Sequence, residues 1–147
     1  MKKAFTLILC LLLFVTSIPV YATEDYENGN TILENGLIVV DELIIESSST
    51  KSTEKNATRR QSFYDGDTLI AVIAFSATFR YDGSSVSVVS KSVTQTDTYS
   101  GWSYKQESFT SSGGTVTLTG KLKYLLIFST TTFTMGMTCD ANGNISY

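Results

Sequence analysis

The chain has 147 residues, of which 42% are hydrophobic and 12% aromatic; it contains no histidine and carries a net charge of −3. This length suits a single domain, and the acidic balance disfavours nucleic acids and anionic membranes, which would repel the chain. Without histidine the chain lacks Ser-His-Asp and Cys-His nucleophiles and most kinds of zinc site. Any catalysis would have to use carboxylates and hydroxyls, and we expect no metal or other cofactor.

Residues 1–22 have the three parts of a cleavable secretory signal peptide. Lys2 and Lys3 give a positive start, residues 4–15 form an apolar core, and the segment ends in Ala22, a small residue of the kind that signal peptidase recognises. The apolar core is shorter than the roughly 20 residues that span a membrane. We therefore expect cleavage after Ala22 and export of the remaining chain without a membrane anchor.

Cleavage would change the chemistry of the exported chain. It removes Cys10 and leaves Cys139 as a lone cysteine, so the exported chain can form no internal disulfide. A lone cysteine with no histidine to activate it is interpreted as a small buried hydrophobe. Losing two lysines leaves nine basic against 14 acidic side chains, a net charge of −5. The expected product is a disulfide-free protein whose stability comes from an apolar core.

Residues 23–60 are predicted to be an acidic N-terminal segment that leads into a linker. Seven acidic side chains and no basic ones fall within residues 23–46. The β-branched residues of 37–45 favour a strand, and a second short strand is possible at 31–33. Residues 47–57 are rich in Ser, Thr and Lys, which is typical of a solvated loop or linker.

Residues 61–147 are predicted to form an all-β domain. From Leu69 to Tyr81, apolar residues alternate with smaller or polar ones, which is the period of a strand with one face on a core. Asp82-Gly83 follows at once and favours a tight hairpin turn. Further strands are predicted at 102–109, 115–124 and 133–139, and Asn142-Gly143 is predicted to fold residues 145–147 back as an edge strand.

Short strands at regular spacing, separated by Gly and Asp/Asn turns, predict an antiparallel β-sandwich. This sandwich would be Ig-like in architecture, though not necessarily in topology.

Three aromatic residues, Trp102, Tyr99 and Tyr104, are candidate ligand-binding residues. Strand alternation places Trp102 and Tyr104 on the same face, where they could stack against a sugar or a peptide. The alternative, which we favour, is that a lone tryptophan at the start of a strand anchors one end of the core. The sequence leaves both interpretations open.

Three aspartates, Asp65, Asp67 and Asp82, could supply the facing carboxyl pair of a glycosidase. All three also fall in predicted turns, and turn chemistry explains them without catalysis. Residues 140–144 begin like a calcium loop, but Ile145 stands where that loop requires glycine, so no metal site is expected.

A pair of neighbouring basic residues, Arg59 and Arg60, closes the predicted linker. We interpret them as an ordinary solvated pair. The alternative is that they form an accessible protease site.

Four segments resemble small secreted proteins of unknown function from Clostridia-like Gram-positive bacteria. These segments are 77–86 (ATFRYDGSSV), 100–104 (SGWSY), 113–116 (GGTV) and 138–146 (TCDANGNIS). The resemblance covers about the last two-thirds of the chain and rests on strand and turn motifs. It implies a Gram-positive exporter and an extracellular address, and it implies nothing about a ligand.

Together these features favour a secreted, non-enzymatic binding or surface-associated module that recognises an extracellular or cell-surface ligand as a monomer. One alternative is an extracellular glycan hydrolase that uses Asp65, Asp67 or Asp82. Another is a matrix component that self-associates through an edge strand, for example the C-terminal one.

Overall fold

The computed structural model describes residues 25–46, 53–99, 101–125 and 129–147, and the regular structure of these residues is entirely β. The strands are β1 (Asp25–Ile32), β2 (Ile38–Glu46), β3 (Glu54–Asp65), β4 (Thr68–Tyr81), β5 (Val86–Thr98), β6 (Trp102–Ser112), β7 (Thr115–Tyr124), β8 (Ser129–Cys139) and β9 (Ile145–Ser146). Within the described part of the chain, no helix has the length and apolar character needed to cross a membrane. The expected signal peptide and its cleavage site at Ala22 lie outside the described residues.

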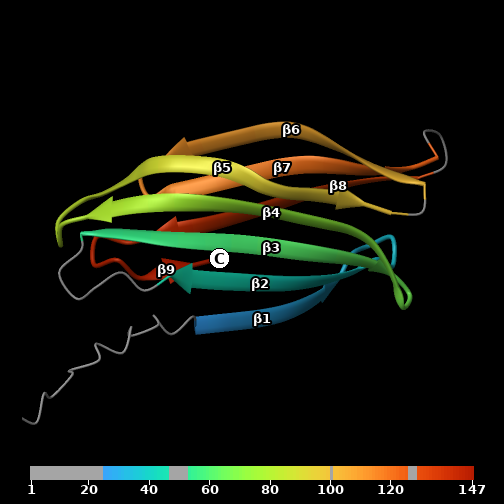
Figure 1. Cartoon of the computed structure of the whole chain (residues 1–147), viewed down its shortest axis with the longest axis horizontal. Helices are drawn as coiled ribbons and strands as arrows, with labels where there is room; N and C mark the ends of the chain where they lie inside the picture. Colours follow the sequence, from blue (N-terminus) through green and yellow to red (C-terminus); the bar gives the residue numbers. More distant parts are fainter. Residues whose placement is uncertain (1–24, 47–52, 100, 126–128) are drawn as a thin grey trace, which may run out of the picture.

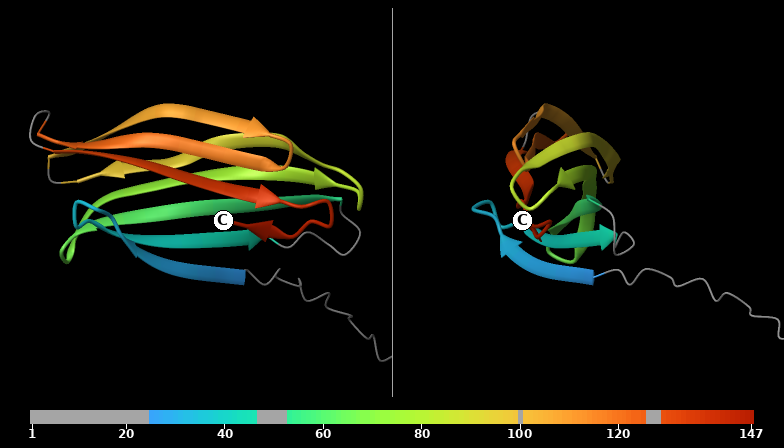
Figure 2. Two further views of the ribbon diagram at one scale, coloured as in Figure 1. Left: turned by 180° about the vertical axis from the view of Figure 1, so that it is seen from behind. Right: turned by 90° about the vertical axis from the view of Figure 1, so that its left-hand side faces the viewer.

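The strands form two antiparallel sheets that pack face to face (Figures 1 and 2). Sheet A has the order β1-β2-β3-β4-β5, and sheet B has the order β6-β7-β8-β9. This confirms the predicted all-β antiparallel sandwich. Each sheet is a simple meander, and the chain passes between the sheets once, from β5 to β6, so the connections differ from the Greek key of immunoglobulin domains.

The predicted boundary at residues 60/61 falls inside β3, because the first three strands are continuous with the rest of sheet A. β3 pairs with β2 from Asn56 to Tyr64 and with β4 along its whole length. The linker prediction is therefore wrong for residues 54–57; residues 47–52 lie outside the described residues. The composition of β3 did not indicate a strand, because most of its side chains are polar. Ala57 and Phe63 on one face of the strand are nevertheless buried.

The interpretation of Arg59 and Arg60 as a solvated pair is wrong for Arg59. Its side chain is only 12% exposed, and its guanidinium makes a bidentate pair with Asp41, from Nε to Oδ1 at 2.9 Å and from Nη2 to Oδ2 at 2.5 Å. Arg60 lies on the opposite face of β3, is 41% exposed, and pairs with Glu42 at 3.4 Å. Alternation along a strand thus separates two neighbouring arginines into different environments.

The core lies between β2, β3 and β4 of sheet A and β7 and β8 of sheet B. Phe75 and Phe79 of β4 are fully buried, as are Leu118 of β7 and Met135 of β8. Cys139 belongs to the same cluster and is 1% exposed, and burial raises the pKa of its thiol. This confirms the interpretation of Cys139 as a small buried hydrophobe.

Gly120 permits a close approach of two aromatic rings to the middle of β7. A Cβ at this position would lie 2.5 Å from Cε2 of Tyr104 and 2.9 Å from Cζ of Phe133. Phe133 is 6% exposed and its ring packs against Phe63 at a centroid distance of 4.9 Å, so it has little room to move. The side chain of alanine would overpack this part of the core.

We expect Gly120→Ala to lower the free energy of unfolding by about 1–3 kcal/mol, the usual cost of overpacking a core. The matched control is Gly29→Ala in β1, where an added Cβ meets nothing within 4 Å. That change should be neutral or stabilising by up to ~1 kcal/mol, because glycine is costly inside a strand. Urea unfolding of both variants measures the difference, and equal effects would contradict the packing argument.

Candidate functional site

The three predicted aromatic residues do not form one platform. Tyr104 faces the core, with its ring 6.1 Å from that of Phe133, and burial raises the pKa of its hydroxyl. Tyr99 is 43% exposed and is fixed through its backbone, which donates to the carbonyl of Ile70 and accepts from the N–H of Trp102. Trp102 is half-buried and packs against the core at the start of β6.

Trp102 is paired instead with Tyr124, a residue that sequence reasoning did not single out as a site residue. The two are Cα partners between β6 and β7, and their ring centroids lie 5.3 Å apart at an interplanar angle of 39°. Such a tilted pair gains stabilisation beyond the burial of its area. Both residues are half-buried, and they lie at the start of β6 and at the end of β7.

A hollow of about 200 Å³ lies beside this pair. Its lining residues are Asp65, Thr68, Ile70, Trp102 and Tyr124. Asp65 and Thr68 are both exposed and are Cα partners across the β3–β4 turn, while Ile70 is 2% exposed and forms an apolar floor. The hollow therefore combines aromatic surface with one carboxylate and one hydroxyl at its rim.

The structure separates the three candidate carboxylates. Asp65 and Asp67 flank the β3–β4 turn, whereas Asp82 lies in the turn after β4. The length of β4 places these turns at opposite ends of the sandwich, roughly 40 Å apart at about 3.3 Å per residue. Glycosidase carboxyl groups lie within ~10 Å of each other, so Asp82 cannot form such a pair with either of the other two.

Asp82 is also chemically unsuited to donate a proton. Its carboxylate accepts hydrogen bonds from the backbone and hydroxyl of Ser84, at 2.9 and 2.8 Å, and from those of Ser85, at 2.7 and 2.9 Å. These hydrogen bonds, the backbone N–H of Ser84 first, hold the pKa of Asp82 well below its usual range. A general acid needs a pKa near the working pH, and Asp82 is instead the organiser of its turn.

Asp140 has the same structural role in the turn before β9. Its carboxylate accepts from the backbone N–H groups of Asn142 and Asn144, each at 2.8 Å, and from the amide of Asn144. Hydrogen bonds from Asn144 are the main reason that the pKa of Asp140 is lowered. Across the described ranges, no three His, Cys, Asp or Glu side chains gather where they could hold a metal ion.

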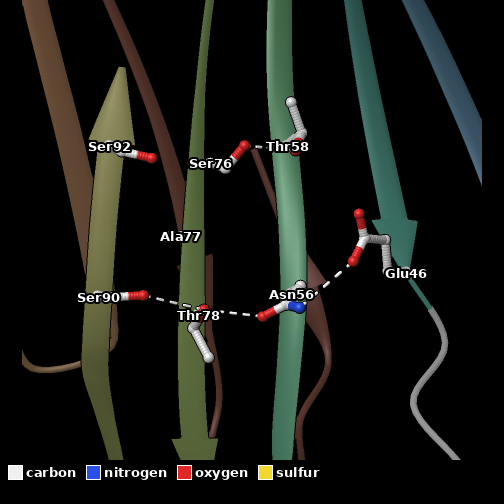
Figure 3. Close-up of a pocket in the computed structure, with 8 residues that line it drawn as sticks. All are labelled: Glu46, Asn56, Thr58, Ser76, Ala77, Thr78, Ser90 and Ser92. Atoms are coloured by element: carbon white, nitrogen blue, oxygen red, sulfur yellow. Dashed lines mark hydrogen bonds between the residues drawn. The ribbon is translucent and has the colours of Figure 1, made fainter. Parts of the chain in front are cut away.

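The outer face of sheet A carries another hollow, of about 180 Å³ (Figure 3). A row of hydrogen bonds crosses four strands there, from Ser90 to Thr78 at 3.0 Å, from Thr78 to Asn56 at 2.8 Å, and from Asn56 to Glu46 at 3.3 Å. No aromatic residue lines it. Because these polar groups already bond to one another, a ligand would have to displace existing hydrogen bonds, and this surface is the weaker candidate.

Comparisons with protein-family models, with curated proteins and with solved structures return no match to this chain. The resemblance to small secreted proteins of Gram-positive bacteria therefore stays a prediction.

Replacing Asp82 by asparagine should flatten the acid dependence of stability. Because the folded-state pKa is depressed, the stabilisation from Asp82 is present above its unfolded pKa near 4 and is lost as pH falls below that value. Urea unfolding at pH 6, 4 and 3 should show a smaller loss for Asp82→Asn than for the unmodified protein. Asp67→Asn, which removes the same charge from an exposed turn, is the control; identical pH profiles for D82N and the unmodified protein would contradict the account.

Proposed function

We propose that this chain acts outside the cell, exported by a Gram-positive bacterium, as a non-enzymatic recognition module that binds a glycan. The hollow beside Trp102 and Tyr124 takes one sugar ring of that glycan. The expected secretory signal of residues 1–22 supports the extracellular location. Glycan binding is supported by an aromatic pair, a carboxylate and a hydroxyl that line the same hollow.

The lining has the chemistry that a sugar ring needs. The face of an aromatic ring offers an apolar surface with a negative quadrupole, which suits the C–H groups on one side of a pyranose. The Asp65 carboxylate accepts hydrogen bonds from two adjacent hydroxyls, and Thr68 can donate or accept. At about 200 Å³ the hollow is smaller than the ~300–1,000 Å³ of pockets for drug-sized ligands, so a single ring at the end or edge of a glycan is the fitting occupant.

The arrangement supports recognition rather than hydrolysis. Glycoside hydrolysis uses two carboxyl groups on either side of the scissile bond, and Asp65 is the one carboxylate that lines this hollow. Asp67 lies two residues further along the same exposed turn and is not part of the lining. One carboxylate is enough to orient hydroxyls but supplies only half of the required pair.

An array of bacterial and host cell-surface glycans, probed with the purified protein, should identify a bound saccharide. Binding of that saccharide should change the fluorescence of Trp102, the only tryptophan in the chain. Trp102→Ala should weaken binding about tenfold or more, since loss of ~1.4 kcal/mol of stacking and burial corresponds to a factor of ten. Asp65→Asn should weaken it through the lost charge-assisted hydrogen bonds.

Ser92→Ala, on the outer face of sheet A, is the matched control and should bind as the unmodified protein does. Near-ultraviolet circular dichroism of each variant separates loss of binding from loss of folding. Unchanged affinity in W102A would place the glycan elsewhere, and release of new reducing ends from the bound saccharide would show that the protein is an enzyme.

A further inference from the structure

The edge of β8 is left largely uncovered in sheet B. On one side β8 pairs with β7 from Ser129 to Thr138, whereas on the other side the two residues of β9 pair only with Thr138 and Cys139. Among the described strands, none pairs with the outer side of residues 129–137. β1 and β2 lie beyond this edge, on the side away from β6 (Figures 1 and 2). Sheet A thus overhangs the uncovered edge.

The register shows which backbone groups of β8 face outward. The N–H of Cys139 donates to the carbonyl of Gly114 at 2.9 Å, so Cys139 faces β7. Antiparallel strands alternate in this respect, and the even-numbered residues of β8 therefore turn their N–H and C=O groups to the open side. Arg59 provides an independent check, because its Nη1 donates to the carbonyl of Gly136 from that side.

A cavity of about 320 Å³ lies between this edge and the inner face of sheet A. Leu33, Val39, Phe63 and Phe133 give it an apolar floor, and Asp41, Arg59 and Gln61 form a polar wall. The wall is internally paired, because Gln61 donates to Asp41 at 2.7 Å in addition to the bidentate contact from Arg59. The wall consequently presents no unpaired charge to an occupant.

Two side-chain bridges frame the open part of the edge. At one end the amide of Asn35 donates to the hydroxyl of Thr131, and at the other Arg59 covers the carbonyl of Gly136. The ring of Tyr147 lies 5.0 Å from the guanidinium of Arg59 and helps to fix it. Between the bridges, Thr132 and Thr134 present their backbone groups to the open side.

We propose that this slot binds an extended peptide segment, which adds to β8 as a further strand. An extended chain is the partner that supplies alternating N–H and C=O groups at the spacing of an unpaired strand edge. Its alternate side chains enter the cavity, so the segment carries apolar residues at every second position and an uncharged polar residue beside Arg59. The slot is separate from the Trp102–Tyr124 hollow, and strand addition does not depend on glycan binding.

A display library of seven-residue peptides with apolar residues fixed at positions 2, 4 and 6 supplies the probe. The best binder is then made with a fluorophore in three forms: unmodified, N-methylated at its odd positions, and N-methylated at its even positions. Because only every second residue of an added strand faces β8, one N-methylated form should bind at least tenfold more weakly and the other should bind as the parent does. Equal binding of both N-methylated forms, or no enrichment from the library, would overturn the proposal.

A matched pair of variants tests the edge from the side of the protein. Thr132→Pro removes one outward N–H and is tolerated where that N–H faces no partner strand, whereas Thr132→Val keeps it. We expect tenfold or greater weakening with T132P and parental affinity with T132V. The N-methylated peptides keep the proposal testable if T132P does not fold. Dimers of the unmodified protein that T132P abolishes would show a second copy in the slot and overturn the assignment to a foreign peptide.

Discussion

The contact between the inner face of β4 and the facing residues of β7 and β8 is the interaction on which the rest of the molecule depends. Cys139 is free and buried, and residues 25–147 hold no other cysteine, so apolar packing rather than a disulfide is the main contact between the two sheets. Phe75 and Phe79 belong to one cluster with Leu118 and Met135, and each of the four is fully buried. β4 can serve this role because it is paired on both sides, with β3 and with β5, from Ala71 to Arg80. Its long, doubly paired backbone is the rigid element from which both ends of the sandwich are positioned.

Sheet A has five strands and sheet B has four, and this difference determines which strands are left uncovered at the surface. The two meanders are joined by one crossing from β5 to β6, so β6 lies opposite β5 and β7 lies opposite β4. As a result, β1 and β2 of sheet A have no full-length strand of sheet B opposite them. The overhang exposes one edge of β8 and the cavity beside it. The length of β4 has a different effect, because it carries the turn of Asp65 and the turn of Asp82 to opposite ends. The topology thus excludes a site that uses both Asp65 and Asp82, whatever the chemistry of each turn.

Much of the fold follows from the sequence, because alternation and turn dipeptides are local signals. The period of two in β4, the Asp82-Gly83 turn and the Asn142-Gly143 turn each identify an element correctly. The site depends on register, which is not local. Counting outward from the hairpin at Gly113 pairs Ser112 with Thr115, and the same count would set Trp102 opposite Leu125. An irregularity between Gln106 and Ser108 shifts the pairing by one residue and brings Tyr124 to Trp102 instead. Nothing in the composition of β6 marks that bulge.

Arg59 shows how a charged side chain can belong to the interior of such a fold. A buried guanidinium is costly unless it is paired and hydrogen-bonded, and here Asp41, the carbonyl of Gly136 and the ring of Tyr147 surround it. The contact of Arg59 with Gly136 covers one end of the exposed edge of β8, and Asn35 covers the other end. Covering a strand edge in this way protects it against unselective pairing with other strands. An edge that is closed at both ends and open between them can accept a short strand while resisting open-ended association.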